Sequence, residues 1–308
     1  MMRTVILNAG PQCNNGCVIC ASASTRAVFR GKRIPPRYLQ KLQENLNAGK
    51  RLGSTRVVVT GGEPTLSAHF LEAVRYAKSI GFKEIILRTN GRLFCYREQA
   101  ASAIGAGVNA FEVSLQGHRA DVHEYLTRAP GSFLQTLGGI RNLLALKQKV
   151  VCTTVICRPN FRHLPEIARL ALEAGVAGLR FCVVEVPAEE REAKAALEIR
   201  QEMAAPWLIK ALDLAASAGK TALVEGVPAC LLGRHGARAA AKTGREDFSL
   251  DPAFPAPPYP CAWTERTDAS LGPECGACSQ FSFCAGPSSA YTERFGWKEF
   301  SPMAVARD

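Results

Sequence analysis

The sequence has no long apolar run, and no stretch of it approaches the roughly 20 apolar residues that a membrane-spanning helix needs. Its apolar start is too short and too soon interrupted to be a signal peptide. Internal repeats are lacking too, and acidic residues are scarce, with 27 Asp and Glu against 38 Lys and Arg for a net charge of +11. We therefore expect a soluble cytoplasmic protein without a membrane partner, whose positive charge favours an anionic substrate or partner.

Cysteine, in contrast, is abundant in this chain. There are 12 cysteines, and they gather at the spacing of metal ligands. A chain with 47% hydrophobic residues does not need disulfide staples to hold its core. In a reducing compartment, clustered thiolates are usually metal ligands, so the sequence predicts metal centres.

Short Val/Ile/Leu-rich runs alternate with amphipathic helical stretches from the start to about Pro187. Such β–α repeats imply a parallel α/β sheet with right-handed crossovers. Six units favour a partial (β/α)6 TIM-type barrel over a doubly wound sheet, although spacing alone leaves both open. The expected strands are Thr4–Leu7, Arg56–Thr60, Glu84–Thr89, Ala110–Leu115, Val150–Cys157 and Leu179–Glu185. The expected helices are Pro36–Ala48, Ser67–Ile80, Arg97–Ile104, Phe133–Leu146 and Leu164–Glu173.

The chain changes character after Pro187. Glu189–Ala218 predicts one or two Ala-rich helices, and Thr221–Glu225 predicts a last strand. Gly233–Phe248 is basic and rich in glycine and alanine, and Asp251–Pro260 is dense in proline. We expect a barrel over residues 1–226 and a loop-rich, cysteine-containing extension over residues 227–308 that needs an internal staple.

Three cysteines follow the first expected strand, in the run Cys13-Asn-Asn-Gly-Cys17-Val-Ile-Cys20. A loop can wrap such a triplet around one metal centre, whereas disulfides would leave an odd thiol. A structural zinc site takes four ligands, while three thiolates on an iron–sulfur cubane leave one iron open. The spacing predicts either an open iron–sulfur cluster or a zinc site that a distant Cys or His completes.

The order of the motifs resembles the radical S-adenosylmethionine (radical SAM) superfamily. In that family a Cys-x3-Cys-x2-Cys loop follows the first strand, and a turn like Gly61-Gly62-Glu63-Pro64-Thr65 follows the second. Ile19 departs from the family pattern, because an aromatic residue usually precedes the third cysteine. Further agreement covers most of the first 187 residues and includes Thr89-Asn90-Gly91, Ser114-Leu115-Gln116-Gly117, His123, Gly131-Ser132-Phe133, Gly139 to Leu143 and Asn160.

The resemblance implies an enzyme with a [4Fe–4S] cluster held by Cys13, Cys17 and Cys20, whose unique iron chelates S-adenosylmethionine (SAM). An electron from a donor such as a flavodoxin or a ferredoxin then cleaves SAM to methionine and a 5′-deoxyadenosyl radical, which abstracts hydrogen from a substrate. It also implies that the backbone of the Gly61-Gly62-Glu63-Pro64 turn, together with Glu63, holds the ammonium group of SAM. A plain strand-to-helix turn is the alternative.

Ser114 and Thr89 resemble positions that contact the ribose or carboxylate of SAM in this family. Hydroxyls at strand ends that cap the following helix are the alternative interpretation. No catalytic residue follows from the resemblance.

A second cysteine cluster, Cys275-Gly-Ala-Cys278-Ser-Gln-Phe-Ser-Phe-Cys284, stands near the end of the chain. It resembles the twitch and SPASM extensions of radical SAM enzymes, which carry auxiliary clusters. The longer form has a fourth cysteine where this chain has Ser288. We therefore expect one auxiliary cluster, a [4Fe–4S] cluster, with zinc as the alternative metal.

The fourth ligand of this second site comes from upstream. Cys261 is the nearer candidate and our first choice, and Cys230 is the second. The auxiliary cluster has three candidate roles: to transfer an electron, to bind substrate through an open iron, or to brace the extension. The sequence allows all three.

Several other residues invite a functional interpretation. His118 and His123 lie close together after Ser114, but solvated or capping roles are expected for them. Cys157 and Cys182 sit near strand ends, where packing is the default for a buried thiol. For Arg180 two interpretations stay open: its side chain reaches the site of the cluster and SAM, or it forms a structural ion pair.

We expect a radical SAM enzyme that modifies a peptide or rearranges or oxidises a small metabolite or cofactor precursor. The first strand begins almost at once, which leans towards a small molecule or a peptide presented by a separate partner. The alternative is a non-enzymatic iron–sulfur or zinc protein that binds nucleic acid. No recognition helix or basic strand interleaved with aromatics supports that alternative, so nucleic acid is not the expected partner.

Overall fold

The computed structural model describes residues 4–21, 23, 37–186, 190–239, 247–249 and 271–303. Strands and helices alternate through most of this part of the chain. Its strands are β1 (Thr4–Asn8), β2 (Arg56–Thr60), β3 (Glu84–Thr89), β4 (Ala110–Ser114), β5 (Lys149–Ile156), β6 (Gly178–Val183), β7 (Thr221–Glu225) and β8 (Asp247–Ser249). Its α-helices are α2 (Arg37–Arg51), α3 (Phe70–Ser79), α4 (Arg97–Ala106), α5 (Ala120–Thr127), α6 (Ser132–Ala145), α7 (Leu164–Ala174), α8 (Arg191–Lys194), α9 (Gln201–Ser217) and α10 (Ser289–Phe295).

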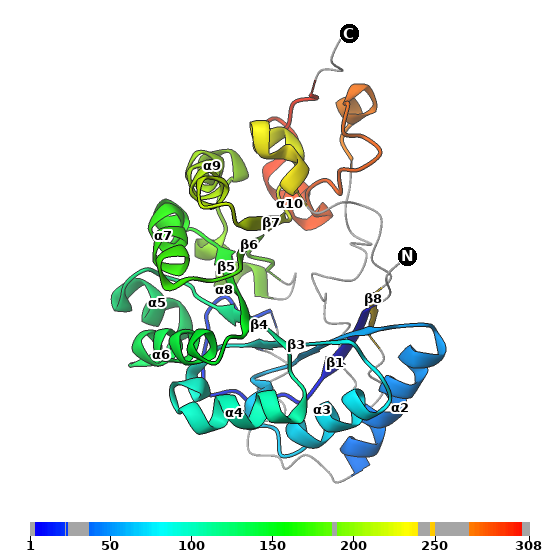
Figure 1. Ribbon diagram of the computed structural model, residues 1–308. Coiled ribbons are helices and arrows are strands. Elements are labelled where there is room, and N and C mark those ends of the chain that lie inside the picture. Colours follow the sequence, from blue (N-terminus) through cyan, green and yellow to red (C-terminus); the bar gives the residue numbers. More distant parts are fainter. Residues whose placement is uncertain are drawn as a thin grey trace.

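The strands form one curled parallel sheet, and helices α2 to α7 and α9 lie on its outer side (Figure 1). The strand order is β7-β6-β5-β4-β3-β2-β1-β8, so β1 to β7 follow one another in sequence without a reversal. A doubly wound sheet reverses its order at a switch point, and this sheet does not. The prediction of a partial TIM-type barrel is confirmed.

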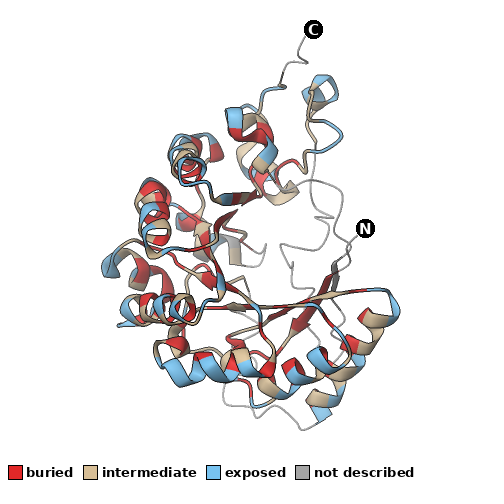
Figure 2. Cartoon of the chain, in the orientation of Figure 1, coloured by how far each residue is buried: buried red, intermediate tan, exposed pale blue. Residues whose placement is uncertain are grey.

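The hydrophobic core lies between the convex face of the sheet and the helices (Figure 2). Phe111 on β4 meets the ring of Phe94 edge-on, with 5.6 Å between the ring centres. On α7, Leu164, Ile167, Ala168 and Ala171 are buried at helical spacing. This packing fixes the backbone of each strand, so the loops at the carboxyl ends start from rigid positions.

The other face of the sheet carries charge. Since side chains alternate along a strand, the neighbours of the core residues point to the concave side. There Arg180 on β6 contacts Glu112 on β4 at 3.0 Å and Glu225 on β7 at 2.7 Å. Arg88 on β3 contacts the other oxygen of Glu112 at 2.8 Å. The interior of the half-barrel is therefore polar, and it is crossed by ion pairs.

Two features differ from the sequence-based expectation. Helix α5 is not among the expected helices, because its sequence is short and mixes polar with apolar residues. In the segment expected to be loop-rich, residues Asp247–Ser249 form strand β8, which pairs with β1 in parallel. Among the described helices, none is both long enough and apolar enough to cross a membrane.

Candidate functional site

The first three cysteines lie on one loop that leaves the carboxyl end of β1, and each is half-buried. The backbone N–H of Cys20 donates to the carbonyl of Cys17 at 3.2 Å, which makes a tight turn between these two residues. The N–H of Asn15 donates to Cys13 Sγ at 3.4 Å. Three thiols on one short loop, with one N–H group directed at the sulfur of Cys13, are a donor set that fits an iron–sulfur cluster.

Two neighbouring elements hold this cysteine loop in place. The N–H groups of Gly16 and Val18 donate to the carbonyls of Thr127 and Leu126, at 2.9 and 3.0 Å, at the end of α5. From the loop after β3, Arg92 donates to the carbonyl of Asn14 and, at 2.8 Å, to Asn15 Oδ1. Contacts with α5 and with Arg92 therefore hold the cysteine loop in its conformation.

The turn after β2 lies directly against the chain that leads into the cysteine loop. The N–H of Gly62 donates to the carbonyl of Gly10 at 2.8 Å, and the N–H of Glu63 donates to that of Gln12 at 2.6 Å. A Cβ atom on Gly62 would lie 2.3 Å from the Gln12 carbonyl oxygen, so only glycine permits this approach. Gly61 has a φ of +135°, and a Cβ atom on it would lie 2.6 Å from the Gly10 carbonyl oxygen. The two motifs are thus parts of one structure.

Glu63 is buried, and its carboxylate is surrounded by donors of the protein itself. Oε1 accepts from the hydroxyls of Thr65 and Thr89, at 2.6 and 2.7 Å, and Oε2 accepts from the N–H of Asn90 at 2.7 Å. Burial raises the pKa of Glu63, and the hydrogen bonds from Thr65, Asn90 and Thr89 act against that rise. The carboxylate joins the ends of β2 and β3, a use that the sequence did not reveal. Pro64 opens the short helix that follows it, η1 (Pro64–Leu66).

The two candidate hydroxyls differ in their surroundings. Thr89 is 3% exposed, donates to Glu63 and accepts from the N–H of Gly91 at 3.0 Å. Ser114 is half-buried at the end of β4, where it is in register with Thr153 of β5. A contact of either residue with SAM stays a prediction. The hydroxyl of Thr89 already bonds to Glu63 and Gly91, whereas Ser114 stands at the carboxyl end of β4.

Ile19, which replaces the usual aromatic residue, is buried in a small apolar cluster with Leu126, Cys157, Val184 and Leu197. This cluster seats the cysteine loop on the carboxyl ends of β5 and β6. Cys157 also contacts Asn160 Oδ1 at 3.3 Å, and burial raises the pKa of its thiol to about 12. Its geometry is that of a packing residue.

The remaining candidate residues, two histidines, Cys182 and Arg180, also have structural contacts. Buried His123 accepts from the N–H of Gln116 at 3.3 Å, and burial lowers its pKa to about 4. His118 packs against His163, with 5.0 Å between the ring centres. Cys182 is buried and its Sγ lies 3.8 Å from the carbonyl of Thr154. Arg180 forms the ion pairs described above.

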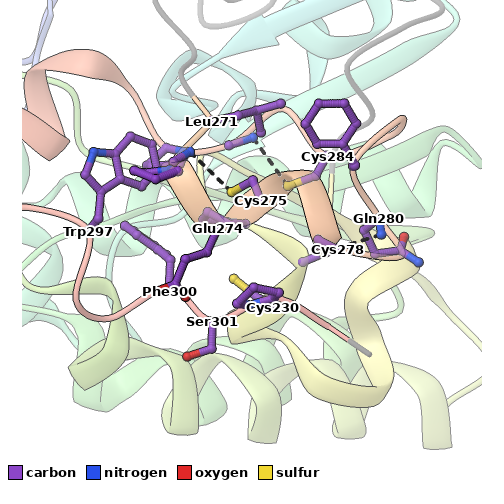
Figure 3. A pocket seen from close by; sticks show the side chains of 18 of the residues that line it. Cys230, Leu271, Glu274, Cys275, Cys278, Gln280, Cys284, Trp297, Phe300 and Ser301 are labelled. Carbon is purple, nitrogen blue, oxygen red and sulfur yellow. Dashed lines mark hydrogen bonds between the residues drawn. The ribbon is translucent and has the colours of Figure 1, made fainter. Parts of the chain in front are cut away.

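The second cysteine cluster lines a cavity of about 310 Å³ at the C-terminal end of the molecule (Figure 3). The cavity is lined by Cys275, Cys278 and Cys284, and also by Cys230 from the short helix η6 (Ala229–Leu231) after β7. Cys261, the first choice for the fourth position, lies outside the described residues. The structure thus brings together the triplet and the second choice.

Backbone N–H groups point at the thiols around this cavity. Gly272 donates to Cys275 Sγ at 3.2 Å, Gln280 and Met303 donate to Cys278 Sγ at 3.4 and 3.3 Å, and Gly286 donates to Cys284 Sγ at 3.3 Å. Burial, and then the nearby thiols of Cys284, Cys278 and Cys275, raise the pKa of Cys230 to about 11. The thiol of Cys230 therefore lies close to the three thiols of the second cluster.

The segment that carries these cysteines is fastened to the barrel separately from them. The buried hydroxyl of Tyr291 on α10 donates to Glu299 at 2.7 Å and accepts from the N–H of Gln201 at 2.7 Å. Glu299 also accepts from the N–H of Glu202 at 2.8 Å. This anchor joins α10 to the start of α9, and no local sequence pattern indicates it.

Residues 7–171, more than half of the chain, match the domain that defines the radical SAM superfamily. The chain belongs to the radical SAM superfamily. Among curated proteins it is 31% identical over 169 residues to an AdoMet-dependent heme synthase of Methanosarcina barkeri, which covers 55% of this chain and 46% of the synthase. It is also 31% identical over 138 residues to a GTP 3′,8-cyclase of Lactiplantibacillus plantarum, which covers 44% of this chain and 40% of the cyclase. The chain thus spans about half the length of the curated relatives it matches.

A solved structure with the same fold is that of SuiB from Streptococcus suis. With S-adenosylmethionine bound, SuiB superposes with a TM-score of 0.65 at 12% identity, over 99% of this chain and 76% of SuiB. With its precursor peptide SuiA bound, the TM-score is 0.66 at 13% identity, over 100% of this chain and 75% of SuiB. At this identity the likeness shows the radical SAM fold and nothing finer.

Proposed function

We propose that this protein is a radical SAM enzyme in which Cys13, Cys17 and Cys20 hold a [4Fe–4S] cluster with one open iron. When bound there, SAM supplies a 5′-deoxyadenosyl radical that abstracts hydrogen from a substrate. The observation that carries the proposal is that the Gly61-Gly62-Glu63-Pro64 turn forms backbone hydrogen bonds with Gly10 and Gln12, which lead directly into the cysteine loop. It makes the cluster ligands and the predicted SAM-binding turn one rigid unit at the carboxyl edge of the sheet.

The residues around the cluster have distinct roles in this proposal. The backbone of the turn holds the ammonium group of SAM. Glu63 orients that turn from beneath, because its oxygens accept from Thr65, Thr89 and Asn90. Ser114 is the hydroxyl offered to the ribose or carboxylate of SAM, whereas Thr89 acts through Glu63. Ile19 and its apolar neighbours exclude water from one side of the loop.

The region after residue 227 carries, in this proposal, one auxiliary [4Fe–4S] cluster of the twitch or SPASM kind. Its ligands are Cys230, Cys275, Cys278 and Cys284. In support, the four thiols surround a cavity of about 310 Å³, and N–H groups point at sulfur as they do around iron–sulfur clusters. Four protein thiolates complete the cluster, so electron transfer or bracing is favoured over binding of substrate at an open iron.

The substrate in this proposal is a peptide or a small molecule, since similar proteins include a GTP 3′,8-cyclase and a structure with a precursor peptide bound. The electron donor is a flavodoxin or a ferredoxin. A reducing compartment such as the cytoplasm suits two oxygen-sensitive clusters and free thiols.

SAM cleavage tests the proposal without knowledge of the substrate. The protein is reconstituted anaerobically with iron and sulfide, reduced with dithionite and given SAM. We expect 5′-deoxyadenosine and methionine from the wild type, none above background from Cys17→Ala, and wild-type amounts from Cys95→Ser, a half-buried cysteine outside both clusters. Absence of 5′-deoxyadenosine from a wild-type protein with a full iron content would contradict the proposal.

A further inference from the structure

A lysine outside the known motifs contacts the cysteine loop. Lys194, at the end of α8, donates from Nζ to the backbone carbonyl of Cys20 at 2.7 Å. It comes from a part of the chain 174 residues further on, after β6. A cation is thus fixed at the third cysteine of the candidate cluster.

Lys194 also pairs with Glu190, four residues before it. Both side chains are mostly buried, at 14% and 17% exposure. A mostly buried ion pair contributes little net stability, because both charges lose much of their hydration. The pair lies beside a candidate cluster ligand, where its two charges act on that site.

The two charges of this pair act on the charge of a bound cluster. A [4Fe–4S] cluster becomes more negative by one charge when it takes up the electron that SAM cleavage needs. A nearby cation stabilises the reduced form and raises the reduction potential, whereas a nearby carboxylate lowers it. Low solvent exposure weakens the screening of both effects.

We infer that Lys194 is a positioning residue of the SAM-binding cluster, which fixes the peptide of Cys20 and raises the reduction potential of the cluster, and that Glu190 limits this rise. The inference rests on the proposed function, since it needs a cluster on Cys13, Cys17 and Cys20. It gives Lys194 and Glu190, which lie outside the cysteine motif, a part in setting the reduction potential of the cluster.

The test is an anaerobic redox titration of the reconstituted holoenzyme, followed by electron paramagnetic resonance, for Lys194→Met, Lys194→Arg and Glu190→Gln. The cluster under study is the one whose signal changes on addition of SAM. We expect a lower midpoint potential in Lys194→Met, a value close to wild type in Lys194→Arg and a higher one in Glu190→Gln. Loss of a merely structural pair would move the Met and Gln variants in the same direction.

An exposed pair serves as the matched control. Lys41 and Glu44 on α2 contact each other at 2.7 Å with 45% and 47% exposure, so Lys41→Met and Glu44→Gln should leave the potential unchanged. Unchanged potentials in the Lys194 and Glu190 variants, or shifts of equal sign, would overturn the inference while a SAM-responsive signal upheld the proposed function. If no signal responds to SAM in the wild type, the proposed function itself fails.

Discussion

Single side chains in this protein tie motifs together that are far apart in sequence. Glu63 belongs to the turn after β2, yet its oxygens accept from Thr89 and Asn90 after β3. The motif pattern placed Glu63 in the turn after β2 but could not give its partners, because a hydrogen bond across 26 residues leaves no local signal. Burial of such a carboxylate is tolerated only when donors surround it.

The buried ring of His123 makes the stability of the protein depend on pH. Its pKa is lowered to about 4 by burial, while an unfolded histidine titrates near 6.5, so the unfolded chain binds the proton more tightly. The stabilising effect of the neutral ring is complete above pH 6.5 and is lost as the pH falls towards 4. We expect about 2 kcal/mol of this loss between pH 6.5 and 5.

This loss of unfolding free energy is measured by urea unfolding at pH 6.5 and at pH 5. The two proteins compared are the wild type and His123→Gln, whose side chain cannot titrate. The variant should lose less stability over this range than the wild type. Equal losses in the two proteins would show that His123 is not held neutral.

At the scale of elements, periodicity and composition predicted the strands well. β2, β3 and β7 have the bounds expected from their apolar runs, because each run is short and has polar residues at both ends. Helix α5 was not expected, since Ala120–Thr127 is short and mixes polar with apolar residues. Its role is tertiary: its last carbonyls receive the N–H groups of the cysteine loop.

The anchor between α10 and α9 supplies a prediction at this scale. Tyr291→Phe removes the hydroxyl that bonds to Glu299 and to the N–H of Gln201, and leaves both partners buried. We expect a loss of about 1 to 3 kcal/mol in the stability of the C-terminal segment, seen as faster proteolysis of that segment. Tyr125→Phe, at an exposed tyrosine, is the matched control and should behave as wild type. Proteolysis of Tyr291→Phe at the wild-type rate would show that the anchor does not hold the segment.

At the scale of the whole molecule, two groups of thiols belong to one chain. The sequence predicted both, because Cys-x3-Cys-x2-Cys and Cys-x2-Cys-x5-Cys are local patterns. It left two candidates for the fourth member of the second group, Cys261 and Cys230. The cavity includes Cys230, whereas sequence proximity favoured Cys261.

Iron content distinguishes these two cysteines. Two cubane clusters bring about eight iron atoms per chain. We expect Cys230→Ala to retain about four and to keep its response to SAM, and Cys261→Ala to retain all of them. Half occupancy in Cys261→Ala with full iron in Cys230→Ala would reverse the assignment.

The central claim is that the loop of Cys13, Cys17 and Cys20 leaves an iron open for SAM. It is tested most directly by the electron paramagnetic resonance spectrum of the dithionite-reduced protein with and without SAM. We predict that SAM changes the signal of one cluster in the wild type, and that this signal is absent from a Cys13→Ala/Cys17→Ala/Cys20→Ala variant that keeps the other. A wild-type spectrum with both clusters present and unaltered by SAM would contradict the account.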